Sequence, residues 1–172
     1  MQLFYHPNIT ENTKQITFDK TESRHIIRVL RKNIGDLLLI TNGNGLLATA
    51  KITVANDKNC TVIVLSLEKK RKLWDYNLHI AIAPTKNNDR YEWFLEKATE
   101  IAIDEITPIF CEHSERKIIK PERFEKIIES AMKQSLKFHL PKLNPFISFN
   151  EFIQKHFSEK LFIAHCKPTE KR

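Results

Sequence analysis

Short apolar runs separated by polar turns characterise the first 72 residues, a pattern typical of β-structure. The segment 42–45 (NGNG) is a strong hairpin signal, because asparagine and glycine tolerate the positive φ angles of tight turns. Residues 23–32 depart from this pattern, since Ile26, Val29 and Leu30 recur at helical spacing and form one apolar stripe. Strands this short, joined by tight turns, predict a small antiparallel β-barrel. The expected strands are Leu3–Tyr5, Leu37–Thr41, Leu46–Val54 and 60–67.

After residue 72 the apolar runs alternate with longer amphipathic segments. We expect strands at 78–83, 105–111 and 161–165, and helices at 90–103 and 121–137. Ser148 and Glu151 have the spacing of a capping box and predict a further short helix. Strands that alternate with helices predict a parallel sheet covered on both faces. The inward-facing residues are expected to be Tyr91, Phe94, Leu95, Ala98, Ile101 and Ala102 in the first long helix, and Phe124, Ile127, Ile128 and Ala131 in the second.

A charge run, 69–72 (KKRK), separates the two patterns and is interpreted as a solvated linker. It divides the chain into a β-domain, 1–72, and an α/β domain, 73–172. The first part holds twelve Lys and Arg against six Asp and Glu, whereas the second holds sixteen against fifteen. Nearly all of the net charge of +7 therefore belongs to the β-domain. This asymmetry suggests a polyanionic partner, nucleic acid first, although a lysine-rich composition would also produce it.

The predicted helix at 23–32 carries the strongest candidates for nucleic-acid binding. Arg24, Arg28 and Arg31 are spaced i, i+4 and i+7, so that they line one helical face, and His25 and Lys32 lie beside them. Guanidinium groups bind phosphate oxygens through two parallel hydrogen bonds. A merely solvated face would show the same spacing, but the charge excess of the domain favours RNA binding.

A second basic group follows the predicted parallel strands. Ligands of α/β domains bind beyond the carboxyl ends of such strands, where a cation could hold a phosphate or stabilise developing charge. Ordinary surface positions would explain these residues equally well. The group comprises Lys86, Arg90, Arg116 and Lys117.

Several features are missing from the sequence. Cys111, His113, His165 and Cys166 match no familiar zinc spacing, so no metal is expected. No apolar run approaches the ~20 residues of a membrane span, and the first ten residues do not resemble a signal peptide. Three widely spaced cysteines favour a reducing, cytoplasmic location. No glycine-rich nucleotide-binding motif is present, and no glycine follows Gly45.

A set of short motifs nevertheless occurs in a fixed order along almost the whole chain. It consists of 25–31 (HIIRVLR) with Gly35-Asp36, Lys86, 96–100 (EKATE), 106–108 (ITP) with Ser114 and Arg116, and 131–135 (AMKQS) leading to Pro141. In this order the motifs resemble the bacterial 16S rRNA uridine N3-methyltransferases, a family of the SPOUT class. Two departures are mild: Ile101-Ala102 stands where Leu-Gly is common, and Lys137 stands where arginine is common.

The resemblance implies a fold and an activity. The fold is an N-terminal PUA-like small β-barrel that docks rRNA, followed by a SPOUT-type α/β parallel-sheet domain. The implied reaction is methylation of N3 of a uridine in 16S rRNA of the 30S ribosomal subunit, with S-adenosyl-L-methionine as cofactor. Members of the family are typically homodimers. The alternative is a non-enzymatic rRNA-binding or assembly protein derived from this family.

The resemblance also implies site residues. Ala164, His165 and Cys166, at the end of the last predicted strand, would border the cofactor. Lys86, Arg116 and Gln134 match positions that face the rRNA or the active-site cleft. The glycine-rich loop that forms the C-terminal trefoil knot of the family has no counterpart in this sequence. We therefore expect the knot part to be absent from this chain, the catalytic residues to lie beyond Arg172, and this 172-residue piece to be inactive alone.

Overall fold

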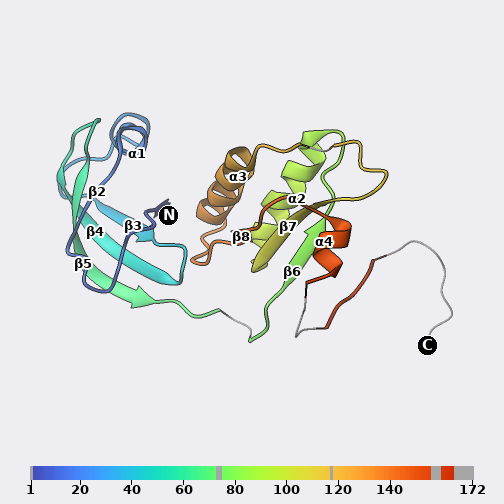
Figure 1. Cartoon of the computed structure of the whole chain (residues 1–172). Helices are drawn as coiled ribbons and strands as arrows, with labels where there is room; N and C mark the ends of the chain where they lie inside the picture. The colour runs from blue at the N-terminus through green and yellow to red at the C-terminus, as the bar shows by residue number, and fades with distance from the viewer. Residues whose placement is uncertain (1, 73–74, 117, 156–159, 165–172) are drawn as a thin grey trace.

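The computed structural model describes residues 2–72, 75–116, 118–155 and 160–164, which form two sheets joined end to end (Figure 1). The first sheet has five strands in the order β1-β3-β4-β5-β2. They are β1 (Leu3–Tyr5), β2 (Gln15–Thr17), β3 (Leu37–Thr41), β4 (Leu46–Val54) and β5 (Thr61–Lys69).

The predicted strands of the β-domain are confirmed, but the sheet is not wholly antiparallel. β1 pairs with β3 in parallel, with Leu3 opposite Leu39. Parallel neighbouring strands need a crossover connection. The chain between β1 and β3 provides it, and this connection contains β2 and the basic helix, residues 20–29. β2 was not predicted, because only Ile16 of its three residues is buried and so its pattern is too short to recognise.

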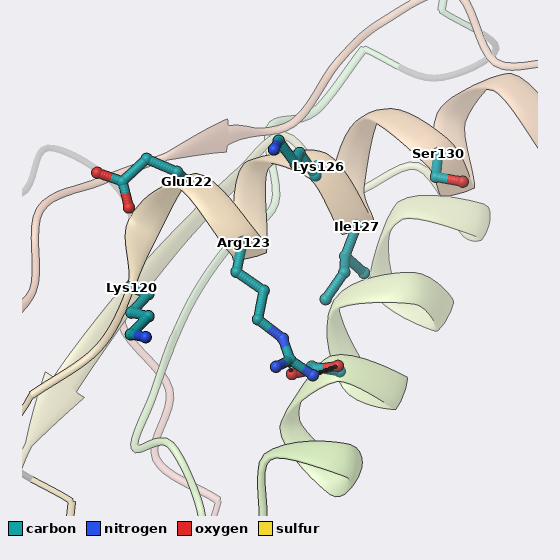
Figure 2. A pocket seen from close by; sticks show the side chains of 7 residues that line it. Lys120, Glu122, Arg123, Lys126, Ile127 and Ser130 are labelled. Carbon is teal, nitrogen blue, oxygen red and sulfur yellow. Dashed lines mark hydrogen bonds and ion pairs between the residues drawn. The ribbon is translucent and has the colours of Figure 1, made fainter. Parts of the chain in front are cut away.

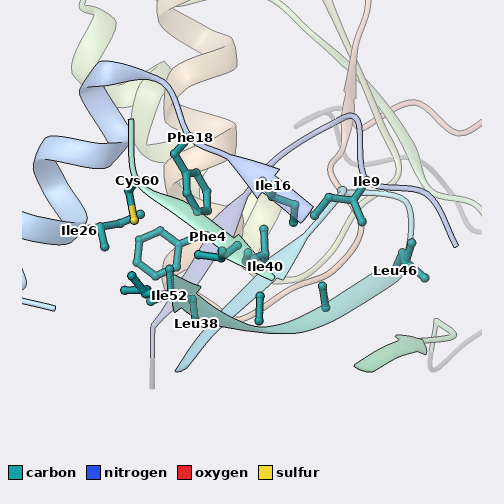
Figure 3. Close-up of a cluster of buried hydrophobic side chains, with 13 residues drawn as sticks. Phe4, Ile9, Ile16, Phe18, Ile26, Leu38, Ile40, Leu46, Ile52 and Cys60 are labelled. Atoms are coloured by element: carbon teal, nitrogen blue, oxygen red, sulfur yellow. The ribbon is translucent and has the colours of Figure 1, made fainter. Parts of the chain in front are cut away.

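The core of the β-domain follows from strand alternation. Leu38 and Ile40 point inward from β3 and are almost fully buried, as are alternate residues of β4. Phe4 and Phe18 close one end of this core, with their ring centroids 6.0 Å apart (Figure 3). The sheet therefore curves around a single apolar cluster, whereas Leu37, Ile63 and Leu65 are exposed on its outer face.

The basic helix differs from its predicted form. α1 (Lys20–Arg24) continues into a π-helical turn, η1 (His25–Val29), in which the Leu30 N–H donates to the His25 carbonyl at 3.0 Å. This wider turn shifts the apolar face, so Val29 is 67% exposed while Ile27 and Leu30 pack against the core. The predicted stripe is thus wrong at Val29. The helix also ends at Val29, three residues earlier than predicted.

The second sheet is parallel throughout, as predicted. β7 (Glu105–Phe110) pairs with β6 (His79–Ile82), β8 (Lys142–Leu143) and β9 (Ile147–Ser148). α2 (Asn88–Glu100) and α3 (Pro121–Gln134) pack together on one face, where Tyr91, Leu95, Ile106, Phe124 and Ile128 form a core. α4 (Phe149–Ile153) begins with the predicted capping box and contacts the other face, where Phe152 lies 5.6 Å from the His79 ring. No described helix is long and apolar enough to cross a membrane.

Two expectations for the α/β domain are wrong. α2 ends at Glu100, so Ile101 is 67% exposed instead of buried. The predicted strand at 161–165 is not formed over residues 161–164, whose side chains are exposed, and His165 lies outside the described residues. A strand requires a partner for its N–H and C=O groups, and none of the strand pairs in the described ranges includes this segment.

The two sheets meet at the β3–β4 hairpin. Its loop contacts the segment after α3 through main-chain hydrogen bonds, from Gly45 N–H to Phe138 O at 2.8 Å and from Leu140 N–H to Gly43 O at 2.8 Å. Lys133 of α3 also lies 3.8 Å from Glu22 of α1. These contacts place α3 next to the β-domain (Figure 1).

Candidate nucleic-acid interface

The basic helix is fixed to the β-domain by polar contacts at its start. The Asp19 carboxylate accepts from the Glu22 N–H at 2.8 Å and caps α1. The buried Ser23 hydroxyl donates to Phe18 O at 3.2 Å and accepts from the Cys60 N–H at 2.8 Å. Together with the buried side chain of Ile26, these bonds hold one side of the helix against the sheet. The opposite side, with its cations, faces solvent.

Four cations and one carboxylate surround a depression of about 440 Å³ on that outer side. Arg28 donates to Asp57 through Nε and Nη2, both at 2.8 Å. The hydrogen bond from Arg28 holds the pKa of the Asp57 carboxyl below its ordinary value, so this group is ionised at neutral pH. Three cations remain beyond this pair, a surplus suited to phosphate groups. We call this the basic depression; it is lined by Lys20, Arg24, Arg28, Asp57 and Lys58.

The three arginines predicted to share a helical face are only partly brought together. Arg24 and Arg28 line the basic depression, but Arg31 follows the helix end in a left-handed conformation, with φ 54°. His25 packs against Phe4, with 6.3 Å between ring centroids, and is therefore partly a core residue. The Lys32 N–H donates to Ile26 O, which closes the helix terminus. The predicted single face is thus replaced by an Arg24–Arg28 pair.

Two cations of the basic depression, and the carboxylate Asp57, were not predicted from the sequence. Lys20 belongs to the first turn of α1, which begins three residues before the predicted helix. Lys58 lies in the β4–β5 turn, 30 residues after Arg28, and only the strand pairing brings the two together. No spacing pattern in the sequence places this turn over the helix.

The second basic group has mostly structural contacts. Arg116 donates to Thr85 O at 3.2 Å and to Lys86 O at 2.7 Å, which ties the loop after β7 to the loop after β6. Lys86 is exposed, with Glu115 at 3.5 Å, and Arg90 is exposed on α2. Gln134 is exposed at the end of α3. Lys117 lies outside the described residues. Arg116 thus positions the loop that carries Lys86.

The expected cofactor residues do not form a site in the described part of the chain. Ala164 is exposed and belongs to no strand, while His165 and Cys166 lie outside the described residues. The role of Ala164, His165 and Cys166 beside the cofactor therefore stays a prediction. Among the described residues, no group of three or more His, Cys, Asp or Glu is arranged to hold a metal ion.

A larger depression of about 590 Å³ lies between α2 and α3 (Figure 2). The Arg123 side chain crosses it from α3 and its Nε lies 2.7 Å from Glu92 Oε1 of α2. Lys120 and Lys126 share the surface with Glu122, so both signs of charge are present. Such a mixed surface gives no strong field for a polyanion, and we do not assign it to RNA.

Comparisons with known proteins agree with the two-part architecture. A family described as the RNA methyltransferase domain matches residues 72–172, and one described as the RNA methyltransferase PUA domain matches residues 18–65. A ribosomal RNA small subunit methyltransferase E from Buchnera aphidicola subsp. Acyrthosiphon pisum is 31% identical over 164 residues, which are 90% of this chain and 64% of the relative.

Solved structures agree as well. A probable rRNA-methyltransferase from Porphyromonas gingivalis is 45% identical, with a TM-score of 0.80, over 89% of this chain and 63% of that protein. The small subunit methyltransferase E of Neisseria gonorrhoeae, solved bound to S-adenosyl methionine, has a TM-score of 0.81 at 22% identity, over 92% of this chain and 67% of that protein. The present chain thus spans roughly two thirds of the length of these relatives. The PUA-like and SPOUT-type folds expected from the sequence are confirmed, and the chain belongs to the RNA methyltransferase family.

Proposed function

We propose that this protein methylates N3 of a uridine in 16S rRNA of the small ribosomal subunit, with S-adenosyl-L-methionine as the methyl donor. The observation that carries the proposal is the match of the RNA methyltransferase domain over residues 72–172. Relatives named as small subunit rRNA methyltransferases support the substrate, and the solved complex with S-adenosyl methionine supports the cofactor. The family resemblance supports a homodimer. No described residue is assigned a role in the transfer itself.

The β-domain supplies the docking surface in this proposal. Its basic depression has three cations beyond the Arg28–Asp57 pair, and these stand on a helix that Ser23 and Asp19 hold in place. Phosphate contacts of this kind set the register of a protein on RNA without reading its sequence. The specificity for one uridine must therefore come from other contacts.

Methyl transfer to the small subunit tests the activity. The full-length protein would be incubated with 30S subunits that lack the modification and with methyl-labelled S-adenosyl-L-methionine. We expect one methyl group per subunit, recovered as 3-methyluridine after nuclease digestion and mass spectrometry. Tight binding to 30S subunits without any methyl incorporation would refute the methyltransferase activity and would support the alternative, a non-enzymatic rRNA-binding protein.

Charge reversal in the basic depression tests the docking surface. Arg28→Glu is expected to weaken rRNA binding about tenfold and to reduce the slope of log K against log salt, because it places a second carboxylate beside Asp57 among the three cations that would hold phosphate. Asp57→Asn should instead strengthen binding severalfold, because it frees Arg28 from its ion pair. Fluorescence anisotropy with labelled rRNA fragments at several salt concentrations measures both effects.

Lys126→Glu is the matched control for this experiment. It makes the same change of charge on the mixed surface between α2 and α3. We expect it to leave the affinity and the salt slope near those of the wild type. Equal weakening by Arg28→Glu and Lys126→Glu would mean that only net charge matters, and the basic depression would not be a docking surface.

A further inference from the structure

The charge run 69–72, interpreted from the sequence as a solvated linker, borders a cavity in the structure. The cavity has a volume of about 290 Å³ and lies where the segment after β5 meets the ends of α2 and α3. Its cationic rim is formed by Lys70, Arg71, Lys72 and Lys137, and its apolar part by Ala102, Leu136 and Phe138. We call it the junction cavity.

We propose that the junction cavity is a nucleotide subsite that holds one unstacked base of single-stranded rRNA, with the adjoining phosphates on its cationic rim. This inference rests on the proposed RNA substrate and adds a location and a mode of recognition to it.

The charge of the rim favours an anion. Among the described residues that line the cavity there are four Lys and Arg and no carboxylate. Lys70 is paired with Glu68 and Lys72 with Asp104, both outside the lining. Within the described ranges, Arg71 and Lys137 make no ion pair, so two full positive charges remain for a ligand. Phosphate is the anion that the proposed substrate supplies on either side of every base.

Two residues in the apolar part of the cavity have a strained backbone conformation. Ala102 and Leu136 follow the ends of α2 and α3 with φ of 63° and 53°, a left-handed conformation that usually selects glycine at this position. Both helices end with the same main-chain hydrogen bond, from Ile103 N–H to Ala98 O at 3.1 Å in α2 and from Lys137 N–H to Met132 O at 3.0 Å in α3. Side chains at these two positions, where glycine is usual, thus form part of the apolar wall of the cavity.

His139 completes the lining as a neutral group. Burial, and then the charge of Lys72, lower the pKa of its imidazole, so the ring is uncharged at neutral pH. A neutral imidazole and the half-buried Phe138 ring are planar surfaces of the kind on which bases stack. The cavity volume lies near the lower end of the ~300–1,000 Å³ typical of ligand pockets, which suits one base better than several.

Phe138→Ala and the double variant Arg71→Glu/Lys137→Glu test the subsite. The probes are a fluorescent single-stranded oligouridine and a double-stranded RNA of equal length. Phe138→Ala should weaken oligouridine binding roughly five- to a hundredfold without changing the salt slope, because stacking releases no counterions. The double variant should weaken it at least tenfold and reduce the slope by about two. Binding of the duplex, whose bases remain stacked, should change little with Phe138→Ala.

Leu136→Gly separates binding from folding. It removes part of the apolar wall and relieves the left-handed strain, so the folded state should be at least as stable while oligouridine binding weakens severalfold. Wild-type affinity for oligouridine in both Phe138→Ala and Leu136→Gly would overturn the subsite. If Arg28→Glu still weakens rRNA binding in that case, the proposed function stands without the subsite. If Arg28→Glu also has no effect, RNA docking by this chain is refuted as well.

Discussion

Replacing Gly45 with alanine is expected to lower the free energy of unfolding by about 2–5 kcal/mol. Gly45 has φ +83°, and a side chain in that conformation costs roughly 1–2 kcal/mol. The new Cβ would lie 2.6 Å from His139 Nε2 and 2.7 Å from Lys70 O, and relief of such overlap costs typically about 1–3 kcal/mol more. Because the Gly45 N–H also bonds to Phe138 O, this strain falls on the contact between the two sheets. Urea unfolding followed by far-UV circular dichroism measures the loss.

Gly35→Ala is the matched control. Gly35 has a similar φ of +95°, but a Cβ there would meet only Lys51 Cε, at 3.9 Å. We therefore expect the backbone cost alone, about 1–2 kcal/mol. Losses of equal size in the two variants would show that the hairpin loop does not press against His139 and Lys70. A change of m-value in Gly45→Ala alone would indicate that the two parts unfold separately once the junction is broken.

The hairpin shows what the sequence could and could not reveal. Asn42-Gly43-Asn44-Gly45 predicted a tight turn between two strands, and β3 and β4 have the predicted bounds. Period-two alternation and turn chemistry are local, so one strand pair can be recognised without knowledge of the rest. The docking of this turn on Phe138 is not local, since the two segments are more than ninety residues apart and no pattern links them.

The prediction of the helix at 23–32 is wrong in part for a different reason. The predicted apolar stripe assumes 3.6 residues per turn, but η1 is a π-helical turn with a wider spacing. Val29 therefore points to solvent, and Arg31 leaves the helix altogether. Within the predicted Arg24, Arg28 and Arg31 set, the two arginines that precede the end of η1 do share one surface. The predicted shared face is confirmed for Arg24 and Arg28 and is wrong for Arg31, which follows the helix end.

The sequence predicts the positive charge of the candidate site, but it does not identify all of the residues that form it. The charge count placed the positive excess in the β-domain, and the basic depression lies there. Asp57 and Lys58 belong to a turn that strand pairing carries over the helix, so neither could be assigned from spacing. The order of short motifs indicated the family, although the segment that it assigned to the cofactor forms no strand at 161–164.

Ile106→Ala is expected to lower the free energy of unfolding by about 2–5 kcal/mol, the usual cost of truncating a buried isoleucine. Ile106 is fully buried on β7, between β6 and β8, and contributes to the core that α2 and α3 cover. Neither helix can move far to fill the cavity, because each also packs against the other. Urea unfolding of the variant, at unchanged m-value, measures this loss.

Ile101→Ala removes the same atoms from a position that the helical pattern placed in the core. In the structure α2 ends at Glu100 and Ile101 is 67% exposed, so its truncation should change stability by no more than about 0.5 kcal/mol. Were the helix to continue through residue 103, as its apolar spacing predicts, Ile101 would be buried and the two variants would be similarly destabilised. The difference between them therefore measures where α2 ends. That end also determines whether Ala102 is free to adopt its left-handed conformation and line the junction cavity.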